Sequence, residues 1–145
     1  MADKNLIGHK LGTFSTEVEK GRLRFFAKAI GETDPVYTDE AVAKAAGHKS
    51  LPLAPTFLKC LEGEGRELTA FLKLVDFDLG RILHAEQSFV YHKMAYAGDV
   101  LTFDATITDV YEKKGGALQF VVTESRVTNQ DGEHIADVRS SLVQR

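Results

Sequence analysis

The sequence predicts an α+β fold in which an antiparallel sheet packs against helices. Apolar residues recur at helical spacing before Gly80, whereas after Gly80 they alternate with polar residues as in half-buried strands. Short segments rich in glycine, aspartate and asparagine separate the alternating runs, and such turns join antiparallel neighbours. A length of 145 residues, without repeats or a linker-like tract, is typical of a single domain spanning residues 1–145.

Helices are predicted from the spacing of apolar side chains and from the residues that end each helix. The first segment has apolar residues at i, i+3, i+4 and i+7, and Gly31 follows it where a C-cap glycine is expected. Pro35 disfavours helical backbone at the residue before it, so residues 32–38 should form a turn. Two prolines argue against regular helix throughout residues 51–58. Helices are therefore expected at residues 19–30, 39–46 and 64–75.

Four strands are predicted after Gly80 because apolar and polar residues alternate there with a period of two. One face of the resulting sheet should be apolar and packed on helices, while the other face is wetter. His84 and His92 share one face of the first predicted strand, but a separation of eight residues makes them poor chelators together. The predicted strands cover residues 83–92, 101–108, 118–122 and 136–142.

Composition excludes several classes of protein. The chain has 18 Lys and Arg residues against 21 Asp and Glu, so it lacks the positive excess of a nucleic-acid-binding protein. No segment approaches the roughly 20 consecutive apolar residues of a membrane helix, and no signal-peptide-like run follows Met1. Cys60 is the single cysteine, so an intrachain disulfide is impossible and we expect a small buried side chain there. A cytoplasmic protein without nucleic-acid or membrane partners is expected.

Three segments carry a resemblance to a known family. Residues 26–39 read Phe-Ala-Lys-Ala-Ile-Gly-Glu-Thr-Asp-Pro-Val-Tyr-Thr-Asp, which resembles the hydratase motif Gly-Asp-x-Asn-Pro-x-His-x-Asp of MaoC-like (R)-specific enoyl-CoA hydratases. Residues 54–57, Ala-Pro-Thr-Phe, resemble the Ala-Pro-Pro-Thr-Phe signature of the fatty-acid-synthase-like dehydratase branch. Residues 91–101 resemble the family's Tyr-x-Arg-Pro-x-x-x-Gly-Asp-x-Leu segment. Three such segments in this order make the resemblance more specific than any one of them alone.

The resemblance implies a hotdog fold, an antiparallel sheet wrapped around a central helix, in dimers or in paired domains. It also implies acyl thioesters of coenzyme A or acyl carrier protein as substrates. The implied reaction is reversible addition of water to a trans-2-enoyl thioester, which needs no metal or other cofactor. The implied partner is a second copy of the chain or a catalytic MaoC-like subunit.

The resemblance also assigns site residues. With Gly31 and Pro35 aligned on the motif, the family's catalytic Asp falls on Glu32, its His on Tyr37 and its Asn on Asp34. Glu32 keeps a carboxylate on an arm one methylene longer, and Tyr37 brings a phenol, which is a poor general base at neutral pH. The candidate catalytic residues are Glu32, Asp34 and Tyr37, and the candidate substrate-binding residues are Gly31, Pro55, Thr56 and Phe57.

Each candidate also has a plain structural interpretation. Gly31 can end a helix, Tyr37 can be a packed aromatic, and the acidic residues can be solvated or cap the next helix. Thr56 can be the N-cap of a core helix. Four functions therefore stay open: a non-catalytic subunit of a heteromeric hydratase or dehydratase, a self-sufficient hydratase using Glu32 or Asp34 with a histidine from elsewhere, a thioesterase using Glu62 or Glu64, and a non-enzymatic acyl-CoA-binding protein.

Overall fold

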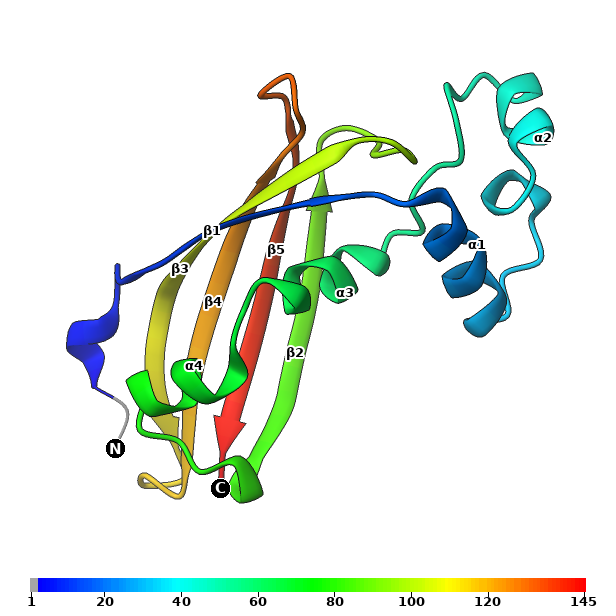
Figure 1. Ribbon diagram of the computed structural model, residues 1–145. Coiled ribbons are helices and arrows are strands. Elements are labelled where there is room, and N and C mark those ends of the chain that lie inside the picture. Colours follow the sequence, from blue (N-terminus) through cyan, green and yellow to red (C-terminus); the bar gives the residue numbers. More distant parts are fainter. Residues whose placement is uncertain (1–2) are drawn as a thin grey trace.

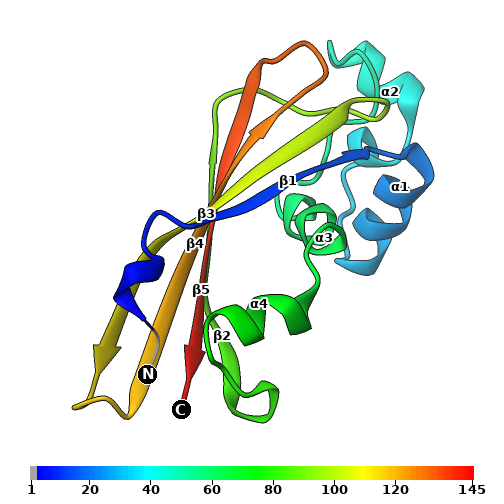
Figure 2. The same cartoon turned by 60° about the vertical axis from the view of Figure 1, so that its left-hand side comes forward.

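The computed structural model describes residues 3–145, which form one five-stranded antiparallel sheet with helices against it (Figure 1). The strand order is β1-β3-β4-β5-β2, so β1 and β2 are the two edges. In Figure 2, α1 to α4 all lie on one side of the sheet. The strands are β1 (Lys10–Glu17), β2 (Ile82–Tyr91), β3 (Val100–Lys113), β4 (Leu118–Thr128) and β5 (His134–Gln144). The helices are η1 (Lys4–Leu6), α1 (Lys20–Ala29), η2 (Pro35–Tyr37), α2 (Glu40–Ala45), α3 (Phe57–Glu64), α4 (Leu68–Leu74) and η3 (Leu79–Arg81).

The central helix α3 packs on the inner face of the sheet and holds the main hydrophobic core together. Leu58 and Leu61 are completely buried, and they belong to one apolar cluster with Leu101 on β3 and Val138 on β5. Burying a side chain of this size removes enough apolar area from water to stabilise the fold by about 1.5–3 kcal/mol. The core therefore depends on contacts between a short helix and three long strands, as expected of a sheet wrapped around a central helix.

The predicted α+β class and the strands after Gly80 are confirmed, but the expectation that helices come first is wrong. The strand β1 precedes all four α-helices and pairs antiparallel with β3. Its alternation is hidden because the pairing register shifts between Lys10 and Gly12, and Leu11 and Phe14 are then three residues apart. A bulge of this kind breaks the period of two by which a strand is found in a sequence.

The predicted helix over residues 64–75 is also corrected. One helix, α3, ends at Glu64, and a second, α4, begins only at Leu68. The break lies at Gly65, where an added Cβ would stand 1.9 Å from Cγ of Phe14. Phe14 of β1 therefore lies against the backbone at the end of the central helix, at a position where only a glycine fits.

Cys60 is exposed, contrary to the expected buried position. The core-facing residues of α3 include Phe57, Leu58 and Leu61, and Cys60 lies on the remaining, outward face of the helix. The residue type of a single cysteine in a short helix does not indicate whether its side chain faces the core or the solvent.

Candidate functional site

The hydratase-like motif forms the end of α1 and the turn that follows it. Gly31 has a left-handed backbone with φ of +73°, and the Glu32 amide donates to the Ala27 carbonyl at 2.9 Å. This is the capping pattern by which a glycine just past a helix satisfies the last carbonyl groups. The predicted helix stop at Gly31 is confirmed, while its proposed contact with substrate stays a prediction.

The two carboxylates of the motif bind the backbone of their own turn. Glu32 Oε1 accepts a hydrogen bond from the Asp34 amide at 3.0 Å, and Asp34 Oδ1 accepts one from the Val36 amide at 3.0 Å. Asp34 is thereby the N-cap of η2, with Pro35 at the first position of that helix. Glu32 is half-buried and Asp34 is exposed. Each carboxylate keeps a second oxygen that makes no hydrogen bond to the described residues.

Tyr37 ends η2 and is half-buried. Its amide donates to the Asp34 carbonyl at 3.2 Å, but its hydroxyl has no hydrogen-bond partner within residues 3–145. The histidine side chains that make hydrogen bonds within the described residues bind Tyr96, the Glu86 carbonyl and Asp137. None of these imidazoles therefore completes a carboxylate–histidine pair with Glu32 or Asp34.

The fold brings the three motif segments together. The Phe26 ring in α1 packs on the Phe57 ring of α3 with 4.9 Å between centroids, and Val36 lies against the same core cluster. The Tyr91 hydroxyl donates to the Pro55 carbonyl at 2.6 Å, which joins the end of β2 to the start of α3. Burial raises the pKa of Tyr91 well above its ordinary value, so its hydroxyl stays protonated and can donate. Segments predicted to act as a unit are thus neighbours in space.

The third segment is held by a buried aspartate. Asp99 is 2 % exposed and accepts from the Tyr96 amide at 2.9 Å and from Lys49 Nζ at 2.8 Å. Its Oδ1 also accepts from Gln130 at 3.2 Å. The carboxylate of the Gly-Asp pair in this segment therefore organises the turn before β3 and is already satisfied.

The predicted substrate-binding residues of the Pro-Thr-Phe segment divide into two groups. Pro55 and Thr56 are exposed where α3 begins, and Phe57 is 3 % exposed within the core. Thr56 is the N-cap residue by position, although its side chain makes no capping hydrogen bond. A thioester contact from Pro55 or Thr56 stays a prediction. Phe57 packs in the hydrophobic core beneath these two residues.

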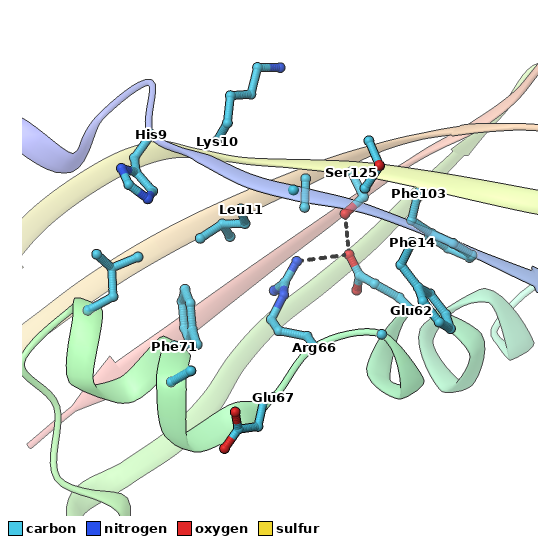
Figure 3. A pocket seen from close by; sticks show the side chains of 16 residues that line it. His9, Lys10, Leu11, Phe14, Glu62, Arg66, Glu67, Phe71, Phe103 and Ser125 are labelled. Atoms are coloured by element: carbon cyan, nitrogen blue, oxygen red, sulfur yellow. Dashed lines mark hydrogen bonds and ion pairs between the residues drawn. The ribbon is translucent and has the colours of Figure 1, made fainter.

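A cavity of about 270 Å³ lies between β1, α4 and the end of α3 (Figure 3). Phe14, Phe71 and Phe103 supply apolar walls, and the charged lining residues are Lys10, Glu62, Arg66 and Glu67. Figure 3 shows Arg66 and Ser125 directed at the same Glu62 oxygen. A cavity with these apolar walls could take part of an acyl chain.

Glu62 is 4 % exposed, and both oxygens of its carboxylate have partners. Lys59 Nζ donates to Oε2 at 2.8 Å, Arg66 lies 3.5 Å from Oε1, and the Ser125 hydroxyl also donates to Oε1. The other thioesterase candidate, Glu64, forms an ion pair with Arg22. The sequence pattern offered no signal for the Glu62 network, because Ser125 comes from a strand 63 positions away.

A second cavity, of about 310 Å³, opens beside the edge strand β2. Leu68, Phe71 and Leu142 give it apolar walls, and Lys59 and Ser140 stand at its polar side. The same edge exposes 50 % of Leu83 and 56 % of Val90. An edge with unpaired backbone groups and exposed apolar side chains is a surface suited to a second subunit.

Known proteins share this fold and this sequence pattern. A family model described as FAS1-like, dehydratase domain region, matches residues 5–138. The chain belongs to this dehydratase family. It is 35 % identical to a UPF0336 protein of Thermobifida fusca over 131 residues, which cover 89 % of this chain and 84 % of that one.

No helix of the described residues is long and apolar enough to cross a membrane.

Two solved structures confirm the hotdog fold expected for a MaoC-like dehydratase. The C-terminally truncated HadBC (3R-hydroxyacyl-ACP dehydratase) complex of Mycobacterium tuberculosis matches with a TM-score of 0.79 and 28 % identity over 95 % of this chain and 96 % of that chain. The MaoC-like dehydratase of Rhodospirillum rubrum matches with a TM-score of 0.72 and 19 % identity, over 99 % of this chain and 96 % of that chain. The second likeness bears on the fold alone.

Proposed function

We propose that this chain is a catalytically altered subunit of a heteromeric (R)-specific enoyl thioester hydratase, or 3-hydroxyacyl thioester dehydratase. In this proposal it shapes the acyl-binding pocket, and a MaoC-like partner with an intact Asp/His motif performs the chemistry. The substrate is an acyl thioester of coenzyme A or acyl carrier protein. The proposed complex is a dimer of unlike subunits that acts in the cytoplasm as a lyase of fatty acid metabolism.

One observation carries the proposal: neither motif carboxylate has an imidazole beside it. Hydration of an enoyl thioester needs one group to activate water and another to deliver a proton to the carbon next to the thioester. Glu32 and Asp34 are engaged with backbone amides, and Tyr37 offers only a phenol at the histidine position. The turn therefore keeps the backbone shape of the motif without the acid–base pair.

Two further features support a partner. The HadBC neighbour, 28 % identical over almost the whole chain, is a complex of dehydratase subunits. The edge strand β2 leaves Leu83 and Val90 exposed, and the second cavity reaches the same strand at His84. A subunit that pairs with this edge would cover exposed apolar side chains and border the cavity, which suits an enclosed site for an acyl chain.

The Glu62 geometry disfavours thioester hydrolysis by this chain. A carboxylate that attacks a thioester or activates water needs a free oxygen in reach of the substrate. Glu62 is buried and bound by Lys59, Arg66 and Ser125. Its position fits a structural anchor for the central helix.

The test measures crotonyl-CoA hydration, followed by loss of enoyl absorbance, for the chain alone and with a co-expressed MaoC-like protein that carries the intact motif. We expect binding without turnover for the chain alone and clear turnover for the complex. Within the complex, Glu32→Gln and Tyr37→Phe should leave kcat within about threefold, whereas alanine at the partner's motif histidine should lower it at least 100-fold, in the range typical of acid–base groups.

The opposite result would assign the chemistry to this chain. If the chain alone turns over and the double replacement of Glu32 and Asp34 by alanine abolishes that turnover, the chain is a self-sufficient hydratase. Release of free thiol from acyl-CoA would instead identify a thioesterase. Tight thioester binding without turnover by any complex would leave an acyl-CoA-binding protein.

A further inference from the structure

Three side chains that can bind metal meet on the outer face of the sheet, away from the motif turn. His92 follows the end of β2, His134 is the first residue of β5, and Asp137 lies three residues further along β5. His92 Nε2 lies 2.8 Å from Asp137 Oδ2, and His134 Nε2 lies 2.9 Å from Asp137 Oδ1. The two imidazole rings are 4.2 Å apart between centroids. Each imidazole therefore lies within hydrogen-bonding distance of a different oxygen of the Asp137 carboxylate.

A β-bulge produces this arrangement. Residues three apart on a regular strand point to opposite faces, yet His134 and Asp137 share a face. The pairing of β4 with β5 runs Val127 to Ala136 and then Thr128 to His134, which skips Ile135. The extra residue turns His134 toward Asp137, which is a known use of bulges at sheet ends.

The loop after β2 is fixed on the same bulge. The Ile135 carbonyl accepts from the His92 amide at 2.8 Å and from the Lys93 amide at 3.2 Å, and the Ile135 side chain is 1 % exposed. His92 is thus positioned by backbone bonds that do not depend on its imidazole. The three potential ligands come from two separate segments, each held by the fold before any ion binds, which lowers the entropic cost of assembling a site.

We propose that His92, His134 and Asp137 bind a divalent transition-metal ion of the Zn²⁺ type, with water completing a four-coordinate shell. Two imidazole nitrogens and one carboxylate oxygen are a ligand set that Zn²⁺ accepts in an open site. The ligand atoms of the three residues all lie within 4.8 Å of one another. Zn–N and Zn–O bonds of about 2.0–2.2 Å place tetrahedral ligands on the order of 3.3 Å apart, so small rotamer changes admit the ion.

The surrounding charges suit a cation. The Asp137 carboxylate presents one oxygen to each imidazole, and an aspartate side chain is ordinarily an anion near neutral pH. Lys93, the nearest cation in sequence to His92, is engaged in an ion pair with Glu133. Arg126 is paired with Asp137 in the β4–β5 register, so its positive charge opposes metal binding.

The ion would act as a structural clip and not in the hydratase chemistry. Ala136 and Val138, the neighbours of Asp137, face the hydrophobic core, so Asp137 points to the opposite side of the sheet from α3. The clip would join the end of β2 to the β4–β5 hairpin. This inference is independent of the proposed function.

The test titrates Zn²⁺ into the metal-free, tag-free protein by calorimetry and records the visible spectrum of the Co²⁺ form. We expect one bound ion and the strong absorption of four-coordinate Co²⁺. His92→Ala, His134→Ala and Asp137→Asn should each weaken binding at least about tenfold, since loss of even outer-shell partners costs that much. His84→Ala removes an exposed histidine outside the cluster and should leave binding unchanged.

Two further measurements make the outcome decisive. Zn²⁺ should raise the thermal midpoint of the native protein, but not that of His134→Ala, and Mg²⁺ should have no effect because it prefers oxygen ligands. Arg126→Ala should bind Zn²⁺ more tightly. Circular dichroism checks that the Asp137→Asn variant is folded, and the His92→Ala variant, outside the strands, repeats the test if it is not. Absence of binding at micromolar Zn²⁺, or equal binding by the native protein and the three variants, would overturn the proposal.

Discussion

The carboxylates of the motif turn and the carboxylate of Glu62 show two opposite uses of one functional group. Glu32 and Asp34 belong to a recognisable motif, yet the structure engages them with amides of their own turn. Glu62 belongs to no motif, yet it is 4 % exposed and bound by side chains of α3, of the following loop and of β4. A buried anion must be paired to persist, whereas an exposed one needs no partner. The buried carboxylate of Glu62 is therefore required by the fold, whereas replacing Glu32 or Asp34 should cost little stability.

The largest effect on stability is expected from Glu62→Ala. Removing the carboxylate leaves Lys59 and Arg66 without their partner and opens space beside Ser125, so the free energy of unfolding should fall by about 3 kcal/mol. Urea denaturation of the native chain and the variant measures this directly. Glu64→Ala is the matched control, since it breaks a more exposed pair with Arg22 and should cost less than about 1 kcal/mol. Equal losses in the two variants would show that burial does not distinguish the carboxylates.

The next effect concerns the glycine that follows the central helix. Gly65→Ala places a methyl group 1.9 Å from Cγ of Phe14, so either β1 or the helix end must move. We expect a loss of about 1–3 kcal/mol, as for other overpacked sites. Gly63→Ala is the control inside α3, because its Cβ would meet nothing within 4 Å. That variant should gain up to about 1 kcal/mol from helix propensity, so thermal midpoints of the two should move in opposite directions.

A smaller loss is expected in the motif turn. Asp34→Ala removes the N-cap of η2 and one hydrogen bond to the Val36 amide, which should cost about 1 kcal/mol. Asp39→Ala, which removes the N-cap of α2, should cost a similar amount. Chemical denaturation compares both with the Glu62 variant. A loss from Asp34→Ala as large as that from Glu62→Ala would contradict the view that the motif carboxylates are dispensable to the fold.

The smallest effect is a pH dependence at the surface. Hydrogen bonds from Lys20 and then Lys44 lower the pKa of Glu40 from 4.5 to about 2. A lowered pKa in the folded state means that the stabilisation is complete above pH 4.5 and is lost as the pH falls toward about 2. Glu40→Gln should therefore flatten the stability profile in this window and leave its shape above pH 5 unaltered. Because this carboxylate is only half-buried, added salt should reduce the difference.

The α+β class and the position of the motif turn could be predicted because they depend on local patterns, and the hotdog fold followed from the resemblance of the three motif segments. Gly31 ends α1, Pro35 starts η2, and β2 to β5 lie where polar and apolar residues alternate. The strand β1 was missed because its bulge breaks that alternation. The break between α3 and α4 was also missed, and only the tertiary structure shows that Phe14 of β1 lies against Gly65, where no side chain fits.

The sequence by itself determined the dehydratase family and the order of its three motif segments, because these depend on residue types at short spacings. Tertiary structure alone decided which distant side chains Glu62 and Asp137 bind. Glu62 meets Ser125 across 63 positions, and His134 turns toward Asp137 only because a bulge removes Ile135 from the pairing. Periodicity reports whether a residue faces the core, but it carries no information about which distant side chain lies opposite. Strand register sets those partners, and in this chain it is shifted by bulges at the His134–Asp137 cluster and in the N-terminal strand.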